Sequence, residues 1–340
     1  MRHEEIQDER IALLANKLSE DYELFPQIIE IHPTDKCNHR CFYCFHEGKG
    51  YNKSREREIL SLDQYLKLFY EMKHLDIHNL SIAGGGEPFL DTRIAIILRG
   101  ARKSDLITRI VTNGTLLTDE ILAEVIYCRE IRFSIDSFTE ETYSKIRNVN
   151  GSMRKIVIKN LEKIINTRNN HHNSELKIGV SFIVSELNIN ELLDFCNEMN
   201  LIDVDTIIVK YDIYDQTPFS DHIRSNVDKA KKISDKVESR VDEKIAPFGL
   251  SCFVPYFKVS FNPYGELFSC CLGSQPGEKN GYFLGNLHNQ SLREIWKASR
   301  DLRQKLIMEG VQCVNCNYTD HKINRRLIKN ETISRSIRNK

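Results

Sequence analysis

Three cysteines near the start of the chain carry its strongest chemical signal. Cys37, Cys41 and Cys44 form a C-x3-C-x2-C motif directly after a β-branched run, IIEIH at Ile28–His32. Three thiolates on one short loop can bind three irons of a cubane cluster and leave the fourth iron without a protein ligand. The alternatives are ordinary buried thiols or a zinc site completed by a nearby histidine, but zinc knuckles usually use two Cys-x2-Cys pairs. The motif therefore predicts an iron–sulfur cluster with one open coordination position.

A second group of cysteines lies in the last third of the chain. Its members are Cys252, Cys270, Cys313 and Cys316, with Cys271 beside Cys270. Four thiolates make a closed site, which suits either a second cubane or tetrahedral zinc, and the spacing alone does not separate the two metals. The spacing also leaves open which of the two adjacent cysteines is a ligand.

The segment CNHRCFYC, with the aromatic Tyr43 just before the third cysteine, resembles the radical S-adenosylmethionine (radical SAM) superfamily, and the resemblance extends over about Ile28–Lys210. AGGGEP at Ala83–Pro88 resembles the glycine-rich turn that this family keeps for the methionine moiety of its cosubstrate. VTNGT and FSIDS resemble the ends of its third and fourth strands. The resemblance implies these cofactor-binding residues: Tyr43, Gly84, Gly85, Gly86, Glu87, Asn113, Ser134 and Arg147.

The same resemblance implies the cofactors and the reaction. A (4Fe–4S) cluster on Cys37, Cys41 and Cys44 binds S-adenosylmethionine, and the 5′-deoxyadenosyl radical formed from it takes a hydrogen atom from the substrate. Around the second cysteine group, GELFSCC, LGNL, SLREIW and CVNC resemble SPASM and twitch domains. No cysteine follows Cys316, so the shorter twitch form with one auxiliary (4Fe–4S) cluster is expected. Cys270 is the expected ligand, which leaves Cys271 as a thiol beside the cluster.

Alternating strand and helix patterns predict the fold that positions these residues. The expected strands are Ile28–His32, Leu80–Ala83, Ile107–Thr112, Ile131–Asp136, Leu176–Val184 and Asp205–Lys210. Ser61 with Gln64 reads as a capping box, and Thr118 reads as another helix start. Strands that alternate with helices pair in parallel, so the pattern predicts an α/β fold with six such units, either an incomplete barrel or an open parallel sheet. The family resemblance implies the partial (βα)6 TIM-like barrel. Side chains at the carboxyl ends of the strands face the active site, which makes Lys210, Tyr211 and Asp212 candidates for binding an anion or accepting a proton.

The sequence predicts five segments in order. They are an N-terminal helical extension (1–24), the barrel (25–215), a charged connecting helix (216–248), the twitch domain (249–320) and a basic tail (321–340). In the twitch domain we expect a hairpin around Asn262–Gly265 and one helix over Leu292–Met308.

Composition narrows the class of protein further. The 340 residues carry 48 Lys and Arg against 48 Asp and Glu, so overall charge gives no reason to expect a nucleic-acid partner. The first 20 residues lack the apolar core of a signal peptide, and no apolar stretch is long enough to span a bilayer. We therefore expect a cytoplasmic protein with reduced thiols and no membrane partner.

These observations predict a radical SAM oxidoreductase. The expected reaction is dehydrogenation of a small polyol, aminocyclitol or sugar, or of a peptide side chain, with a flavodoxin or ferredoxin as electron donor. Two alternatives stay open. One is a peptide epimerase in which Cys271 donates a hydrogen atom, and the other is a non-catalytic protein with structural zinc at both cysteine groups.

Overall fold

The computed structural model describes residues 24–44, 57–171, 175–212, 220–241, 249–272, 282–311, 313 and 316–329. The predicted N-terminal extension, up to residue 23, and the last eleven positions of the predicted tail (330–340) lie outside these residues. The chain divides into two compact units. The smaller comprises Met1–Glu30, Arg57–Asn79 and Ile245–Lys340, and the larger comprises Ile31–Glu56 and Leu80–Lys244.

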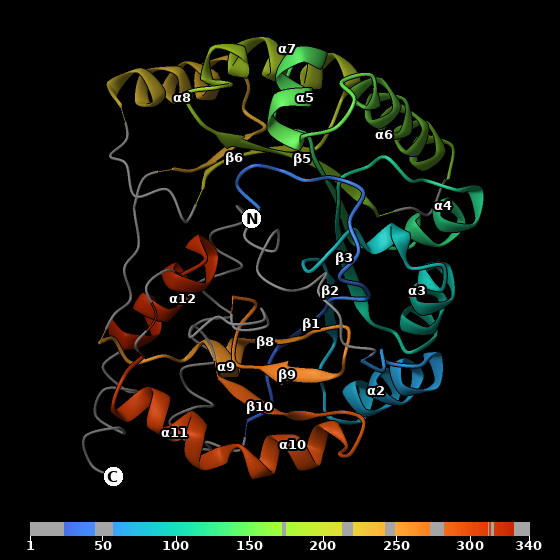
Figure 1. Cartoon of the computed structure of the whole chain (residues 1–340), viewed down its shortest axis with the longest axis vertical. Coiled ribbons are helices and arrows are strands. Elements are labelled where there is room, and N and C mark those ends of the chain that lie inside the picture. Colours follow the sequence, from blue (N-terminus) through green and yellow to red (C-terminus); the bar gives the residue numbers. More distant parts are fainter. Residues whose placement is uncertain are drawn as a thin grey trace. The chain divides into compact units, whose positions relative to one another are not determined.

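The larger unit is an α/β fold with a parallel sheet. Its strands follow one another in the order β2 (Asn79–Ile82), β3 (Ile107–Thr112), β4 (Glu130–Ser134), β5 (Lys177–Val184), β6 (Thr206–Tyr211) and β7 (Val237–Arg240). The pairings β3–β4, β4–β5, β5–β6 and β6–β7 are all parallel. In Figure 1 the helices of this unit lie along the outer side of the strands. They are α3 (Ile94–Lys103), α4 (Asp119–Val125), α5 (Glu140–Arg147), α6 (Met153–Asn170), α7 (Leu192–Ile202) and α8 (Asp221–Ile233). This arrangement is that of a partial TIM barrel.

The core of the larger unit lies between strands and helices. Side chains alternate along a strand, so every second residue points to the helical side. Phe133 of β4, Phe182 of β5 and Val209 of β6 are completely buried there. The neighbouring residues on these strands point to the opposite side of the sheet, where charged and hydroxyl side chains are common. The sheet thus keeps a dry outer face and a polar inner face.

Two expectations about this unit need correction or extension. The predicted connecting helix (216–248) needs correction, because its described residues form a helix at Asp221–Ile233 and the extra strand β7 at Val237–Arg240, while 216–219 and 242–248 lie outside the described residues. The helix is also more than a connector, since Ile223 and Val227 are buried on its apolar face. The six predicted strands are confirmed to within about two residues at each end.

The smaller unit combines a short sheet with helices. Its strand order is β10 (Phe283–Asn286), β9 (Glu266–Phe268), β8 (Lys258–Phe261) and β1 (Ile28–Ile31), and β8, β9 and β10 are antiparallel. Its helices are α2 (Leu62–His74), α9 (Val254–Phe257), α10 (Leu292–Ala298), α11 (Arg300–Met308) and α12 (Tyr318–Lys329). The predicted hairpin is confirmed as β8–β9.

Two predictions for the smaller unit were only partly right. The single helix expected over Leu292–Met308 is interrupted at Ser299, which separates α10 from α11. Arg303 of α11 folds back to donate to the Trp296 carbonyl oxygen, and its guanidinium stacks 3.7 Å from the Trp296 ring centroid. The predicted basic tail begins as a helix, because α12 runs to Lys329 and buries Ile323 and Leu327.

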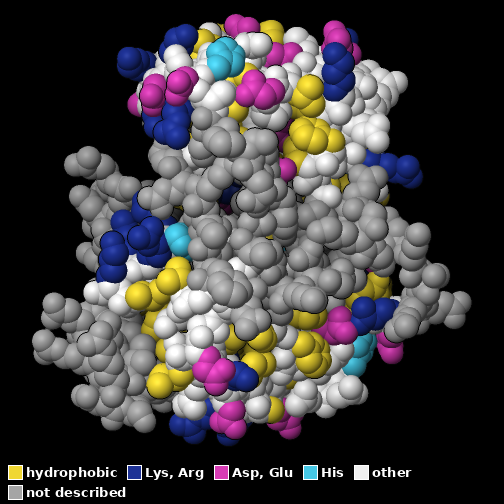
Figure 2. Space-filling view, turned by 60° about the vertical axis from the view of Figure 1, so that its left-hand side comes forward, with side chains coloured by type: hydrophobic (Ala, Val, Ile, Leu, Met, Phe, Trp, Pro, Cys, Tyr) yellow, Lys and Arg dark blue, Asp and Glu magenta, His cyan; other side chains and the backbone are white. Residues whose placement is uncertain are grey.

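The surface is mixed in charge. In Figure 2, acidic and basic side chains are interspersed at the upper and lower ends of the drawn face, and one group of Lys and Arg side chains lies near its left edge. This mixture fits the formal net charge of zero for the whole sequence. Among the described helices, none has the length and apolar content needed to cross a membrane.

Candidate metal and cofactor sites

The three-cysteine loop is fixed to the end of α5 by backbone hydrogen bonds. The Arg40 amide donates to the Arg147 carbonyl oxygen at 3.0 Å, and the Phe42 amide donates to the Ile146 carbonyl oxygen at 3.1 Å. Within the loop, the Cys44 amide donates to the Cys41 carbonyl oxygen at 2.9 Å. The main chain therefore holds Cys41 and Cys44 in a turn whose position is set by the strand–helix framework.

The three cysteine thiols of this loop influence one another's ionisation. Burial, with smaller contributions from Glu87, Cys41 and Cys44, raises the pKa of the Cys37 thiol to about 12 against the opposing hydrogen bond from the His39 amide. Iron ligation would reverse this effect, because a coordinating thiol loses its proton to the metal charge.

The glycine turn after β2 packs directly against the segment that leads to the cysteines. Gly84 and Gly85 have φ angles of +54° and +68°, which side chains rarely adopt. A Cβ at Gly84 would collide with the buried His32 ring, and a Cβ at Gly86 would collide with the Lys36 carbonyl group. The turn therefore accepts only glycine at these positions, because protein atoms occupy the space that a Cβ would need.

Glu87 anchors this turn to the end of β3. Its buried carboxylate accepts hydrogen bonds from the Thr112 hydroxyl at 2.6 Å, the Asn113 amide at 2.7 Å and the Phe89 amide at 3.1 Å. Burial raises the pKa of Glu87, while these donors oppose the rise. The predicted role of Glu87 in cofactor binding stays a prediction, and its observed contacts hold the turn in place.

Asn113 connects the end of β3 to the cysteine loop. Its side-chain amide donates to Asn38 Oδ1 at 2.7 Å, and the Asn38 amide donates to Thr115 Oγ1 at 2.8 Å. Asn38 lies between the first two cysteines of the motif. The VTNGT segment therefore supports the loop, which is consistent with its predicted place at the site.

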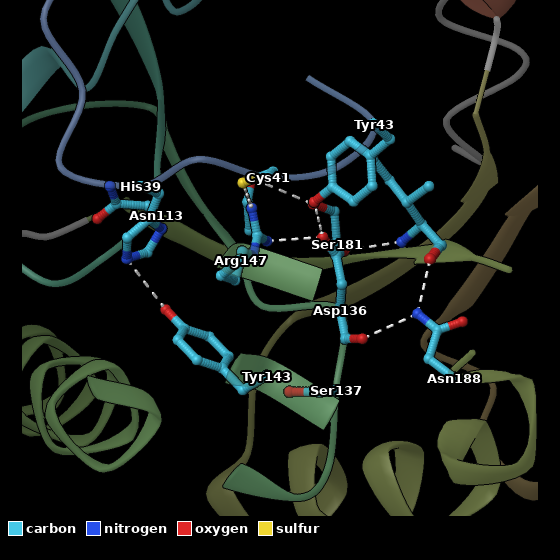
Figure 3. A network of polar contacts seen from close by, with 12 residues as sticks. His39, Cys41, Tyr43, Asn113, Asp136, Ser137, Tyr143, Arg147, Ser181 and Asn188 are labelled. Carbon is cyan, nitrogen blue, oxygen red and sulfur yellow. Dashed lines mark hydrogen bonds and ion pairs between the residues drawn. The ribbon is translucent and has the colours of Figure 1, made fainter. Parts of the chain in front are cut away.

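A buried charged cluster lies beside Cys41, and Figure 3 shows its members pointing toward one another. Arg147 Nη2 lies 2.6 Å from Asp136 Oδ2, and Arg147 Nη1 donates to Cys41 Sγ at 3.3 Å. The Tyr43 hydroxyl donates to the same Asp136 carboxylate. Burial disfavours charge on Arg147, but Asp136 and Tyr43 outweigh it and keep the pKa of the guanidinium well above its usual value. Burial raises the pKa of Tyr43.

Asp136 is the residue of this cluster that the sequence did not single out. It is fully buried with a left-handed φ of +63°, and its other carboxylate oxygen accepts the Ile183 amide at 2.7 Å. The signal was present in FSIDS, where an acid is the last residue of the predicted strand Ile131–Asp136. Ser134, which was singled out, is half-buried, and Ser181 Oγ lies 3.4 Å from its hydroxyl.

Lys210 is placed as predicted, at the end of β6 on the inner face of the sheet. It is half-buried, and desolvation followed by repulsion from Arg132 lowers its pKa to about 7, with Asp136 acting in the opposite direction. Tyr211 and Asp212 follow it and are also half-buried. Their predicted catalytic roles stay predictions.

The second cysteine group gathers in the smaller unit. Burial raises the pKa of the Cys252 thiol, with Cys270 and Cys313 adding to the rise. Burial likewise raises the pKa of Cys316, and Asp320, Cys270 and Cys252 contribute. Such mutual effects require neighbouring sulfurs, so the four predicted ligands lie in one neighbourhood.

Cys271 lies near the same cysteines and also contacts buried charged side chains. Its sulfur lies 3.8 Å from Lys258 Nζ and 4.0 Å from Asp320 Oδ2. Lys258 in turn lies 3.0 Å from Asp320 and 3.7 Å from Glu30, and all three charged side chains are buried. The sequence did not single out this network. Its only visible sign was a lysine within the otherwise apolar run VPYFKVSF.

Comparison with protein families gives two matches. A model described as the radical SAM superfamily matches residues 31–199, and one described as an iron–sulfur cluster-binding domain, SPASM, matches residues 252–317. Together they account for more than two thirds of the chain. The first match contains the three-cysteine loop and the glycine turn, and the second contains the four-cysteine group.

Individual relatives are distant. A GTP 3′,8-cyclase of Limosilactobacillus fermentum is 29% identical over 198 residues, which cover 57% of this chain and 57% of that protein. The alignment thus spans little more than half the length of that curated relative. A tungsten-containing aldehyde ferredoxin oxidoreductase cofactor-modifying protein of Pyrococcus furiosus is 23% identical over 320 residues, 84% of this chain and 86% of that protein.

Solved structures share the fold. Streptococcus suis SuiB bound to S-adenosylmethionine superposes with a TM-score of 0.62 at 14% identity, covering 82% of this chain and 68% of that one. The anSMEcpe structure with bound AdoMet gives a TM-score of 0.57 at 14% identity, covering 92% and 95%. The chain belongs to the radical SAM superfamily, with a C-terminal SPASM or twitch iron–sulfur domain, and its cofactors are S-adenosylmethionine, a (4Fe–4S) cluster and an auxiliary (4Fe–4S) cluster.

Proposed function

We propose that this radical SAM enzyme is an oxidoreductase that dehydrogenates its substrate. The observation that carries the proposal is the pair of cysteine sets, an open group of three in the larger unit and a closed group of four in the smaller. A closed thiolate site has no free position for a substrate, so electron transfer is the role that suits it best. When bound, the cofactors supply a radical that removes one hydrogen atom and an acceptor for one electron.

Several residues of the larger unit would bind the first cluster and S-adenosylmethionine together. Cys37, Cys41 and Cys44 are the proposed cluster ligands, and the turn Gly84–Gly86 would offer its backbone to the methionine end of the cosubstrate. Arg147, held beside Cys41 by Asp136, would contribute a fixed positive charge near that end. Because Asp136 and Tyr43 already orient the guanidinium, little ordering would be needed on binding.

Dehydrogenation also releases a proton, which the protein must accept. Loss of a hydrogen atom, an electron and a proton from an H–C–O–H unit leaves a carbonyl group, so the atoms balance with one base. Lys210 and Asp212, at the end of β6, are the proposed candidates. The wider setting that we propose is cytoplasmic, with a low-potential donor such as flavodoxin or ferredoxin.

The substrate is proposed to be a small molecule, with a peptide side chain as the second class. Curated relatives are named as acting on nucleotides, such as GTP 3′,8-cyclase and a nucleotide dehydratase. SuiB is described bound to a precursor peptide. These names support both the small-molecule class and the peptide class of substrate, and they do not identify the reaction.

One observation favours a second function, peptide epimerisation. Cys271 contacts Lys258 and Asp320, so its thiol is separated from the proposed ligand role of Cys270. A thiol in that position could give a hydrogen atom to a substrate radical. The variant Cys271→Ala would then cleave the cosubstrate normally but form no epimerised product, whereas unchanged turnover removes this function.

The test of the main proposal is isotope transfer in the anaerobically reconstituted, reduced protein. Deuterium from the attacked carbon should appear in 5′-deoxyadenosine, and the product should be two hydrogens poorer than the substrate. A product with no change in hydrogen count would contradict dehydrogenation. The zinc alternative makes a separate prediction, since a structural zinc protein would contain two zinc ions and no sulfide.

A further inference from the structure

The inner face of the sheet in the larger unit carries a group of positive charges at neighbouring positions. The register places Arg132 of β4 beside Gly179 of β5, and Lys210 of β6 beside Arg240 of β7. In the same register Lys210 lies level with Ile183, four residues further along the strands than Arg132, and Ser134 and Ser181 lie between these two levels on the same face. Because alternate residues share a face, these side chains all point to the side that helices do not cover.

Among the described residues, the Lys210 side chain differs from the other charges on this face because it forms no ion pair or hydrogen bond. Arg132 lies 3.7 Å from Glu130, and Arg240 lies 3.4 Å from Glu238. A partly buried ammonium without a counter-ion is unfavourable, and two guanidinium groups nearby make it more so. Such an arrangement is stabilised when an anion binds to it.

Asp136, the nearest acid acting on Lys210, is already engaged. Its carboxylate holds Arg147 and Tyr43 and accepts the Ile183 amide, so its hydrogen-bonding capacity is largely used. The charged groups that face Lys210 from the surrounding elements are Glu130 and Arg132 of β4, Asp136 after β4, Arg147 of α5, and Glu238 and Arg240 of β7. The neighbouring strand β5 presents Ser181 and Ile183, which carry no charge.

We propose that Lys210, with Arg132 and Arg240 beside it, is a subsite for a phosphate or carboxylate group of a small-molecule substrate. The inference rests on the proposed function, since it assigns a substrate class to the same site. A bound anion keeps Lys210 protonated, so Lys210 does not accept the proton and that role falls to Asp212.

The carboxylate of S-adenosylmethionine could also bind Lys210, but the position of Arg147 favours that residue as its partner. Arg147 Nη1 donates to Cys41 Sγ, so the charge nearest the cluster ligands belongs to α5. Lys210 belongs to β6, with β5 standing between it and β4 in the sheet. Arg147 is already paired with Asp136 and Cys41, whereas Lys210 comes from a different element, β6, so the two residues can hold two anions, one on the cosubstrate and one on the substrate.

The experiment measures anion binding by calorimetry to the full-length, anaerobically reconstituted protein saturated with S-adenosylmethionine. Pyrophosphate serves as the phosphate probe and succinate as the carboxylate probe. Wild type should bind one of them, and Lys210→Gln should weaken that binding about tenfold or more, the value of one charge-assisted contact. Lys177→Gln is the matched control, because this exposed β5 lysine pairs with Asp205 at 3.1 Å and should leave the affinity unchanged.

The variant Lys210→Arg keeps the positive charge, and the pH dependence of its anion binding gives a result that misfolding could not produce. Lys210→Arg should bind the probe at pH 8.5 as well as at pH 6.5, whereas wild type should lose affinity relative to it as Lys210 loses its proton. Binding of neither probe at millimolar concentration, equal binding by Lys210→Gln, or binding that appears only in a parallel titration without S-adenosylmethionine would each overturn the subsite. Formation of 5′-deoxyadenosine in the same samples tests the radical chemistry separately, so the two failures are distinguishable.

Discussion

The positive charge of Lys210 should make the stability of the protein depend on pH. The unfolded chain keeps this proton up to about the ordinary lysine pKa of 10.5, whereas the folded chain loses it near pH 7. Between these values the unfolded state binds more protons, so stability attributable to this group rises with pH. Lys210→Met should therefore have a higher free energy of unfolding in urea than wild type at pH 7, and the difference should shrink toward pH 9.5 by at most about 1.4 kcal/mol per pH unit. If the unfolding free energies of the two proteins differed by the same amount at every pH, the lowered pKa of Lys210 would be contradicted.

Asp136 and Arg147 form a buried ion pair, and the pair stabilises the folded protein only when both partners are present. Removing one partner leaves the other charge buried, so Asp136→Asn or Arg147→Met should each destabilise the protein by about 3–5 kcal/mol. The double variant should lose much less than the sum, because no lone charge remains. Denaturant unfolding of the four proteins completes the cycle, and additive losses would show that the pair is not coupled.

At the scale of single residues, the sequence predicts the cysteine ligands better than it predicts the side chains that hold those cysteines in place. Cysteine spacing is local, so a motif of eight residues was enough to predict the first cluster site. The partners of Cys41 come from the end of β4 and from α5, and only the fold brings them together. Lys258 and Asp320 are separated by more than sixty residues, and nothing local in either segment indicates that they meet.

At the scale of elements, the glycine turn after β2 depends on close packing as well as on backbone freedom. Gly84 and Gly249 both have positive φ, but a Cβ at Gly84 would strike the buried His32 ring while one at Gly249 would meet nothing within 4 Å. Alanine at either position costs about 1–2 kcal/mol of backbone strain. Gly84→Ala should lose additional stability and bind less iron on reconstitution, measured by thermal unfolding and metal analysis. Equal effects of the two substitutions would mean that the contact with His32 is unimportant.

Helix starts were predictable where the side chain itself makes the cap. Ser61 and Gln64 form the predicted capping box of α2, and Thr118 caps α4 by accepting the Ile121 amide. Strand β7 was not predictable in the same way. Its sequence, VESR, has one β-branched residue, and it is a strand because β6 offers it a parallel edge. Tertiary pairing outweighed local propensity there.

At the scale of the whole molecule, the sequence predicted consecutive domains, whereas each of the two observed units is built from segments that are separate in sequence. Leu60 donates to the Pro263 carbonyl oxygen at 2.8 Å, and Trp296 Nε1 donates to the Leu24 carbonyl oxygen at 3.1 Å. These contacts group Leu24–Glu30 and Arg57–Asn79 with the C-terminal third of the chain. Sequence reasoning assigned both early segments to the barrel region, because consecutive residues are expected to pack together unless a long-range contact is known.

The division into two units predicts that the two clusters can be lost separately. The proposed ligands Cys37, Cys41 and Cys44 all belong to the larger unit, and Cys252, Cys270, Cys313 and Cys316 all belong to the smaller. Anaerobic wild type should contain about eight iron and eight sulfide, as two four-iron cubanes require. Cys316→Ala should keep about half of each and still cleave S-adenosylmethionine, because the open cluster is intact.

Cys41→Ala is the reciprocal variant. It should also retain about half of the iron, now at the closed site, but should form no 5′-deoxyadenosine. If Cys316→Ala lost all of its iron while remaining folded, assembly of the first cluster would depend on the second, and the two units would not be independent metal sites. If Cys41→Ala still cleaved the cosubstrate, the open coordination position would have to lie at the other cysteine group, and the proposed roles of the two groups would be exchanged.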